Sequence, residues 1–203
     1  MKKILSIVLI LCCMLAICSC SLFKKGGDND DNGNTASGLE AFENAVAATN
    51  ASYVKYDAEV ETDLGKLTTS MTVSYNNDGS ATITYAYDKF NSIDEGAADE
   101  IMSTVSGTIL RAADGTYSGD VPEGLDVSGT AASPAINFAP VKDSAVVSEK
   151  GDVLTLTVPA ANSAEVYGSA FSKDSTLEIF IKGGVVSLME ITFEGGVVTY
   201  QYN

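Results

Sequence analysis

The spacing of apolar residues changes near residue 52, from a period of about 3.6 to a period of about 2. Before that point Leu39, Phe42 and Val46 recur at helical spacing and share one face. This pattern predicts a short amphipathic helix that ends near residues 49–50.

After residue 52 apolar and polar residues alternate. In residues 67–75, Leu67, Met71 and Val73 stand at odd positions, and Thr or Ser stands between them. Such alternation is typical of an antiparallel strand with one face on a core and the other in water. Asp-Gly pairs at 78–79 and 114–115 indicate tight hairpin turns. The predicted strands are residues 52–63, 67–76, 80–90, 105–112, 116–121, 144–148, 153–158, 176–182, 185–193 and 197–202.

Several stretches depart from this alternation. Residues 91–100 are acidic and ambiguous, with a short helix as one interpretation. Residues 122–140 contain three of the four prolines, which predicts a long loop or an edge segment. Residues 163–171 predict a second short helix with Asn162 as its N-cap. Residues 185–193 are apolar at successive positions, which predicts a strand covered on both faces.

Together these elements predict a mainly β fold of the α+β class. We expect one large antiparallel meander sheet, curved into a half-barrel, with two or three short helices. Residues 39–203 would form a single antiparallel β-rich domain, long enough to bury a core of its own.

The first residues, MKKILSIVLILCCMLAICSCS, form a separate unit. Lys2 and Lys3 precede an apolar stretch over residues 4–17, and Cys20 then follows Ile17 at a spacing that resembles the lipobox of bacterial lipoproteins. A helix over this stretch would be roughly 21 Å long, short of the roughly 30 Å hydrocarbon core, which argues against a membrane span. An ordinary secretory signal, the other alternative, would carry small residues in an A-x-A pattern.

The lipobox resemblance implies that residues 1–19 are a lipoprotein signal peptide and that the sulfur of Cys20 carries lipid. Residues 20–38 would then be the lipidated cysteine and a flexible acidic linker. Within this linker, residues 28–33 begin like a calcium-binding loop, but Leu39 stands where that loop needs a carboxylate. We therefore expect a solvated linker and a protein held by lipid at the outer, extracellular face of the cell membrane, with a Gram-positive envelope as the better fit.

Composition narrows the expectations for the domain. All four cysteines lie in the first 20 residues, so the domain has no internal disulfide and depends on its core for stability. The formal net charge of −15 repels nucleic acid. We interpret this charge as a source of solubility and of distance from the membrane, with a site for cations or basic ligands as the alternative.

The chain lacks the residues of common active sites. It has no histidine, which is the usual general base near neutral pH and the commonest metal ligand. Ser52 and Lys55 have the S-x-x-K spacing of penicillin-binding proteins, but on a strand they face opposite ways. The acidic residues in 94–100 are a candidate for a cation site or a carboxylate pair, with a solvated loop as the preferred interpretation. We therefore predict no enzyme activity, no cofactor and no metal.

The order of the elements resembles the LolA-like superfamily of lipoprotein carriers, which includes the mycobacterial lipoproteins LppX and LprG. A helix opens residues 39–203, a long meander follows, and a short helix precedes the closing hairpins. This resemblance implies a half-barrel of antiparallel strands whose concave side holds helices around an apolar cavity for acyl chains.

Two functional hypotheses follow. The first is a non-enzymatic surface lipoprotein that binds or carries a lipid or another apolar ligand. The second is a protein-interaction or envelope-sensing β-module without a pocket. The expected partners are the membrane, through Cys20, and the apolar ligand; nucleic acid is excluded and a protein partner is left unknown. An alternative for the predicted lining is that it only fills a dry core. The residues predicted to line the ligand site are Met71, Val73, Ile83, Tyr85, Leu177, Ile179, Leu188 and Met189.

Overall fold

A computed structural model describes residues 35–63, 65–90, 102–119, 121–122, 131–168 and 170–203. The predicted signal peptide, Cys20, the calcium-loop pattern and the acidic run at 94–100 lie outside the described residues. The first described element is the helix α2, Thr35–Ala48, which begins inside the predicted linker.

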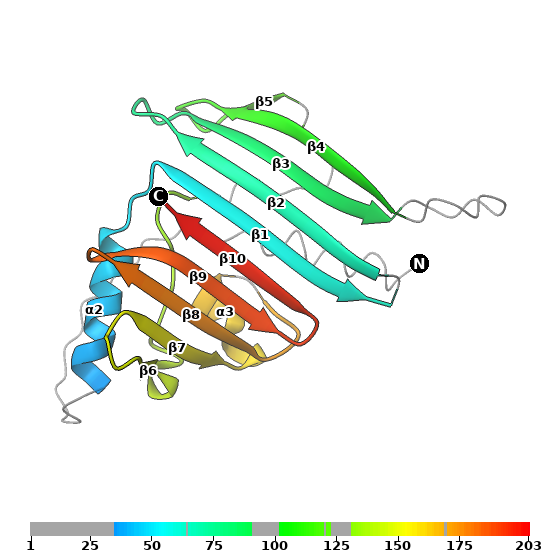
Figure 1. The fold of residues 1–203 in the computed structure, drawn as a ribbon. Helices are drawn as coiled ribbons and strands as arrows, with labels where there is room; N and C mark the ends of the chain where they lie inside the picture. The colour runs from blue at the N-terminus through cyan, green and yellow to red at the C-terminus, as the bar shows by residue number, and fades with distance from the viewer. Residues whose placement is uncertain (1–34, 64, 91–101, 120, 123–130, 169) are drawn as a thin grey trace.

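Ten strands form one antiparallel sheet, which is open and not closed into a barrel (Figure 1). The predicted mainly β fold is therefore confirmed, and every predicted strand has a counterpart, although β5 and β6 are very short. The strands are β1 Tyr53–Thr62, β2 Gly65–Tyr75, β3 Ala81–Phe90, β4 Met102–Arg111, β5 Tyr117–Gly119, β6 Val146–Val147, β7 Val153–Val158, β8 Ser175–Lys182, β9 Val185–Phe193 and β10 Gly196–Tyr202.

The sheet consists of two meanders that meet at its centre. The strand order is β5-β4-β3-β2-β1-β10-β9-β8-β7-β6, so the first and last strands of the chain are neighbours. At that seam the Tyr53 amide donates to the Asn203 carbonyl at 3.1 Å, and the Asn203 amide donates to the Tyr53 carbonyl at 2.9 Å. The expected single meander is thus two meanders joined by a pair that is distant in sequence.

Two hairpin turns show why the Asp-Gly pairs were good turn signals. The Ser80 amide and hydroxyl both donate to one Asp78 carboxylate oxygen, at 2.9 and 2.7 Å, and Thr116 makes the same two bonds to Asp114. These donors hold the pKa of both carboxyl groups below the usual range. The following glycine has a positive φ in each turn, 85° and 86°, which other residues rarely adopt.

The two faces of the sheet differ because side chains alternate along each strand. We call the inner face the one that carries the buried side chains of the strands, such as Tyr56, Met71 and Ile179, and the outer face the opposite one. Helix α2 packs on β8, β9 and β6 and buries Phe42, as the helical spacing predicted. Figure 1 views the outer face, with α2 and α3 behind the sheet.

Residues 131–141 form a crossing segment without regular secondary structure, in keeping with the predicted loop. The Ala51 amide donates to the Ala132 carbonyl at 2.8 Å, and the Asn137 amide donates to the Val166 carbonyl at 3.1 Å. The segment therefore runs between the end of α2 and the helix α3, and it buries Ile136, Phe138 and Val141 in the core.

Helix α3, Ser163–Tyr167, is shorter than predicted, and Asn162 stands at its N-cap position as predicted. The side chain of Asn162 makes no capping hydrogen bond, because a 3-10 turn, η2 Ala160–Asn162, leads directly into the helix. The Ser163 hydroxyl instead links the turn before the helix to the segment after it: it donates to the Ala160 carbonyl at 2.7 Å and accepts from the Phe171 amide at 2.7 Å. Gly168, with a φ of 73°, ends the helix.

Tyr167 anchors α3 to the sheet. Its ring is fully buried, and its hydroxyl lies 3.1 Å from that of Ser175 at the start of β8. Burial raises the pKa of Tyr167 to about 12, and the hydrogen bond with Ser175 opposes that rise. The ring packs edge-on against Phe171, which in turn packs against Phe193, at centroid distances of 5.2 and 5.6 Å. This aromatic row fixes α3 on the inner face.

The prediction that residues 185–193 are covered on both faces is wrong. The inner residues of β9, such as Met189 and Ile191, are buried, but Leu188 on the outer face is only half-buried and Val185 is exposed. Among the described residues no helix lies over the outer face (Figure 1). Leu188 instead pairs across the strands with Phe180, so outer-face neighbours shield it in part.

Candidate functional site

Seven of the eight residues predicted to line a ligand site share the inner face and are buried. Their strands place them in direct cross-strand pairs: Met71 with Tyr85, Val73 with Ile83, and Ile179 with Met189. The eighth residue, Leu188, lies on the opposite face, where it pairs with Phe180 and Gln201.

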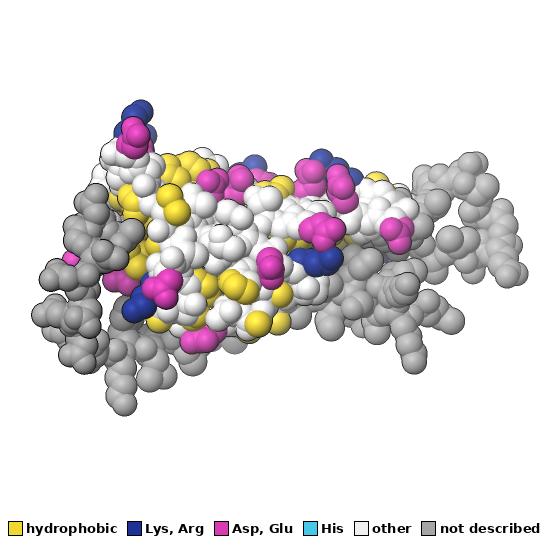
Figure 2. Space-filling view, turned by 90° about the horizontal axis from the view of Figure 1, so that it is seen from below, with side chains coloured by type: hydrophobic (Ala, Val, Ile, Leu, Met, Phe, Trp, Pro, Cys, Tyr) yellow, Lys and Arg dark blue, Asp and Glu magenta, His cyan; other side chains and the backbone are white. Residues whose placement is uncertain are grey.

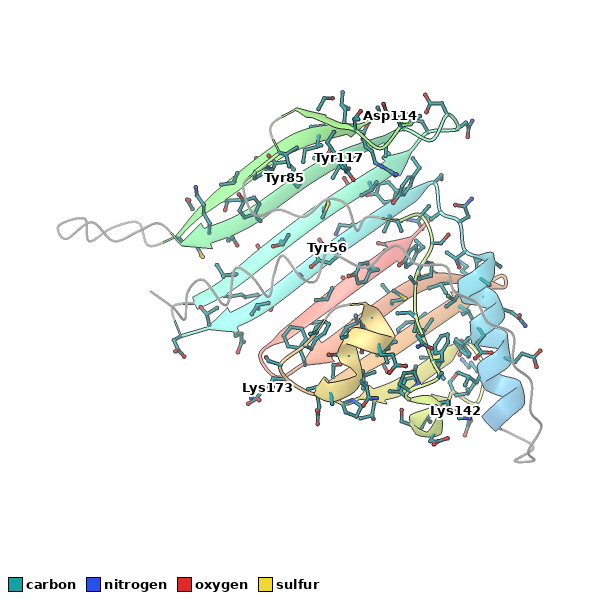
Figure 3. The ribbon with its side chains drawn as sticks, turned by 180° about the vertical axis from the view of Figure 1, so that it is seen from behind. Tyr56, Tyr85, Asp114, Tyr117, Lys142 and Lys173 are labelled. Carbon is teal, nitrogen blue, oxygen red and sulfur yellow. The ribbon has the colours of Figure 1, made fainter. Side chains whose placement is uncertain are left out.

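The seven residues fall into two groups on the inner face. Leu177, Ile179 and Met189 belong to β8 and β9, the strands on which α2 packs. The other group, which we call the β2–β3 patch, consists of Met71, Val73, Ile83 and Tyr85. Figure 3 shows α2, α3 and the crossing segment over β7–β10, whereas no described helix lies over β2 and β3.

The β2–β3 patch is apolar and is buried in the structure. Met71 and Ile83 are fully buried, and Ile109 of β4 continues the patch in line with Ile83. Among the described residues, α2, α3 and the crossing segment cover one half of the inner face, the half that contains β8 and β9.

A row of tyrosines crosses the inner face at the level of Met71. Tyr200, Tyr56, Met71 and Tyr85 are successive cross-strand partners from β10 to β3. The rings of Tyr56 and Tyr200 meet edge-on, with centroids 5.2 Å apart. The row gives the face a broad, rigid apolar surface, because aromatic rings bury large areas with few rotatable bonds.

Tyr85 lies flat over β4, and Gly107 permits this. Gly107 pairs with Tyr85 across the strands, and a Cβ atom at Gly107 would collide with the Tyr85 hydroxyl. The ring of Tyr85 also lies 6.2 Å from that of Tyr87, centroid to centroid. Figure 3 shows Tyr56, Tyr85 and Tyr117 spread across this half of the face.

The hydroxyl of Thr69 is a buried polar group in the half of the inner face that β1–β5 form. Thr69 is buried on the inner face of β2, opposite Tyr87 and Ala58. Its hydroxyl has no hydrogen-bond partner in the part of the chain that the structure describes. A buried hydroxyl without a partner is costly, so this atom is a point at which a polar ligand atom would be stabilised.

Charges are divided between the two faces of the sheet. The outer face carries the acidic residues of the described strands, while the inner face carries Arg111 of β4 and, at the opposite end, Lys89 of β3. Figure 2 shows acidic side chains spread over one side of the molecule among polar ones. The acidic strand residues are Asp57, Glu59, Glu61, Asp88, Glu178 and Glu190.

Arg111 was missed by the sequence-based prediction of the site. It is the only arginine of the chain. It is separated from Val105 and Ile109 by an even number of positions along β4, so the three side chains lie on the same face. That spacing was a usable signal, because a charged residue in the apolar register of a strand needs a physical reason to be there. The prediction considered only apolar and aromatic residues and so passed over it.

Asp88 is an outer-face carboxylate whose oxygens are both hydrogen-bonded to neighbouring strands. One carboxylate oxygen accepts from the Thr68 amide and hydroxyl, at 3.0 and 2.6 Å, and the other accepts from the Thr104 hydroxyl at 2.6 Å. Thr104 and then Thr68 hold the pKa of Asp88 below its usual range. This carboxylate spans β2, β3 and β4 and has a structural role.

The S-x-x-K pattern does not form a nucleophile and a base. Ser52 precedes β1, and its hydroxyl donates to the Asn203 carbonyl at 3.4 Å. The Lys55 ammonium lies on the outer face and pairs with the Asp57 carboxylate at 2.6 Å. Both groups thus serve the seam between β1 and β10 and the outer surface.

The described ranges contain no group of acidic, histidine or cysteine residues arranged to hold a metal ion. Within the same ranges, helices long and apolar enough to cross a membrane are absent.

No protein-family model matches the sequence, and a comparison with curated proteins finds none similar to it. Solved structures with a similar outline include LprF from Mycobacterium bovis, which is 13% identical with a TM-score of 0.39 and is matched over 83% of this chain and 92% of that one. A porin-like protein from Bacteroides uniformis is 12% identical with a TM-score of 0.29, over 76% of this chain and 97% of that one. A DUF1329 family protein from Desulfovibrio piger is 9% identical with a TM-score of 0.24, over 83% of this chain and 91% of that one. At TM-scores this low, function has to be argued from the chain's own residues.

Proposed function

We propose that the protein binds the acyl chain of a lipid, or another extended apolar ligand, against the β2–β3 patch. The observation that carries the proposal is the unequal cover of the inner face. Apolar and tyrosine side chains line the whole width of the sheet, whereas the described helices α2 and α3 lie on the β6–β10 side of it. An apolar sheet face that is larger than its helical cover is a natural place for an apolar partner.

Burial supplies the binding energy in this proposal. Each methylene removed from water contributes about 0.8 kcal/mol, so an acyl chain along the strands gains several kcal/mol before the entropic cost of binding is subtracted. The tyrosine row from Tyr200 to Tyr85 offers a rigid surface, which lowers that cost. No bond is made or broken, and the protein acts as a carrier or a sensor.

The place of action that we propose rests on the sequence. A lipid on Cys20 would hold the domain at the outer face of the membrane, where acyl lipids are at hand. Cell fractionation of Cys20→Ser should find the protein released from the membrane, while Cys18→Ser should leave it bound. Release by both variants, or by neither, would refute lipid anchoring at Cys20.

Native mass spectrometry of the full chain, before and after extraction with organic solvent, tests the function. We expect extra mass that the solvent removes and that is identified as acylated lipid. Met71→Gln keeps the size of the side chain but places an amide in the patch, so it should lower the bound fraction about tenfold or more. The matched control is Leu188→Gln on the outer face, which should keep the lipid.

Melting curves of both variants show whether each remains folded, and only folded protein counts in the comparison. A clean mass for the unmodified chain would exclude a tightly bound lipid and would refute the proposal. Equal loss of lipid from the two glutamine variants would place the ligand somewhere other than the β2–β3 patch.

A second candidate, the interaction module, is supported by one feature of the sheet edge. β5 pairs only with Ile109–Arg111 of β4, so residues 102–108, which pair with β3 on one side, have no second partner strand in the described part of the chain. These residues contain no proline and no charge, the usual guards of an exposed edge. An extended segment of a partner protein could add here as a further strand. Slower amide exchange in residues 102–108 upon mixing with a purified partner would support this function.

A further inference from the structure

We propose that the ligand is an anionic lipid and that Arg111 binds its carboxylate or phosphate head. This inference rests on the proposed acyl-binding function and adds the chemistry of the head group. It is carried by the position of a guanidinium at the end of the apolar face that has no partner among the described residues.

The first step is the position of Arg111. Side chains alternate along β4, so Val105, Ile109 and Arg111 lie on the inner face together. Arg111 pairs with Ala81 of β3 on one side and with Tyr117 of β5 on the other. It is half-buried, and it follows fully buried Ile109 directly along the face. The apolar face therefore ends in a cation.

The second step is the lack of a partner. No ion pair or hydrogen bond of the Arg111 side chain occurs among the residues that the structure describes. Lysines elsewhere do find carboxylates, as Lys55 does with Asp57 and Lys173 with Glu194. In a chain with 27 acidic residues, an arginine that has no partner among the described residues and lies at an apolar face is unusual, and the described part of the chain leaves its donors available to a ligand.

The third step concerns two described acidic residues that lie at the same end of the sheet as Arg111. Asp78 and Asp114 belong to two turns at the same end of the sheet, where a Cβ atom at Gly79 would lie 3.8 Å from that of Ala113. Both carboxylates already accept two hydrogen bonds within their own turns, from Ser80 and Thr116. Neither carboxylate forms an ion pair with Arg111.

The fourth step is the match of chemistry. A guanidinium presents a planar fork of donors that fits a carboxylate or a phosphate with two parallel hydrogen bonds. Partial burial strengthens such a contact relative to water. With the head at Arg111, the acyl chain would lead from β4 towards the tyrosine row, and binding would require that Ile109, Ile83 and Met71, which are fully buried in this structure, become accessible to it. Acidic strand side chains lie on the outer face, so they do not repel the head at short range.

A simpler interpretation is that the aliphatic stem of Arg111 covers Tyr117 while the head group stays in water. In that case the charge of Arg111 would make no difference to which lipid is bound. The two interpretations differ in a measurable way, because only the first makes binding depend on the head group.

The test compares two ligands with the same chain and different heads, oleate and oleyl alcohol, on the delipidated full chain. The unmodified protein should bind oleate on the order of tenfold more tightly than oleyl alcohol. Arg111→Gln should remove that preference by weakening oleate alone, and Arg111→Lys should keep part of it. Lys182→Gln makes the same change of net charge on the outer face and should leave the preference intact. Melting curves show that each variant is folded.

Each outcome separates the two levels of the proposal. If neither ligand binds the unmodified protein, the acyl-binding function itself fails. If both bind equally, or if the preference for oleate survives in Arg111→Gln, the role of Arg111 is refuted while acyl binding stands. Equal weakening of both ligands by Arg111→Gln would also refute it. Inorganic phosphate is the third probe: Arg111-dependent binding of phosphate as tight as that of oleate would mean a free-anion site and would overturn the lipid assignment.

Discussion

Gly107 is the residue whose missing side chain shapes the inner face most directly. The ring of Tyr85 occupies the space above it, so the tyrosine lies along the sheet and not upright. A flat ring widens the apolar surface between β3 and β4. The glycine is thus part of the proposed ligand surface, although it contributes no side chain to it.

Gly107→Ala should destabilise the protein by about 1–3 kcal/mol, because the new methyl group forces Tyr85 out of its position. Urea unfolding of the full chain measures the free energy of unfolding. The cost should largely disappear in the background of Tyr85→Leu, which removes the colliding ring atoms. Purely additive effects of the two substitutions would show that the collision is relieved in another way.

At the residue scale the sequence predicted the inner face well where the alternation is regular. Met71 and Val73 occupy alternate positions of β2, and Ile83 and Tyr85 occupy alternate positions of β3. The positions between them are mostly polar. Leu188 was assigned to the wrong side because Leu188 and Met189 are consecutive, and consecutive strand residues face opposite ways. In an apolar run the sequence alone holds no clue to which of the two faces the core.

At the element scale, Thr49 connects the end of α2 to the sheet. Its hydroxyl donates to the Ala45 carbonyl at 2.7 Å and accepts from the Val186 amide at 2.8 Å. All three groups are in the buried interior, where a lost hydrogen bond is not replaced by water. Near this contact the pairing of β8 with β9 shifts between Phe180 and Ile181. The Thr49 hydroxyl therefore provides a hydrogen-bond acceptor for the Val186 amide, next to the irregularity in the pairing of β8 with β9.

Thr49→Val keeps the shape of the side chain and removes the hydroxyl. The Val186 amide would be left buried without an acceptor, which should lower the free energy of unfolding by about 1–3 kcal/mol. Thr192→Val on the exposed outer face of β9 is the control and should change stability by less than about 0.5 kcal/mol. Equal effects of the two substitutions in urea unfolding would contradict a structural role of the Thr49 hydroxyl.

The sequence predicted the positions of the helices and strands better than it predicted which segments pack over them. Hairpin strands follow from local alternation and from turns such as Asp78-Gly79, so their ranges came out nearly as observed. The N-cap position of α3 falls on Asn162 as predicted, but its side chain makes no capping hydrogen bond, and the preceding 3-10 turn has no signature of its own in the sequence. Residues 131–141 were expected to be a loop, but their burial of Ile136 and Phe138 depends on tertiary contacts that no local pattern contains.

At the scale of the whole molecule, the pairing of β1 with β10 is the feature that the sequence could not supply. The two strands are separated by nearly the full length of the domain, and no turn joins them. Local patterns predict hairpins and therefore a single meander. The seam instead divides the sheet into one half under the helices and one half with the proposed ligand face (Figures 1 and 3).

This division predicts a gradient of local stability across the sheet. Amides of β8 and β9 lie between two partner strands beneath α2, whereas residues 102–108 of β4 have one described partner strand. Hydrogen exchange followed by mass spectrometry should show slower exchange in β8 and β9 by about an order of magnitude or more. Peptides of β3, paired on both sides, should be intermediate. Protection of residues 102–108 equal to that of β9 would contradict the gradient.

The hydrogen bonds between Tyr53 and Asn203 also decide how the domain would respond to a pulling force. The start of β1 and the end of β10 lie side by side, so tension applied at these two points loads the bonds of the seam one after another. A strand pair opened in this way unzips, and it resists far less than a pair pulled along its length, where all bonds share the load. A pull on residue 203 against an anchor before residue 53 would thus peel β10 from β1 and part the two meanders along the middle of the sheet.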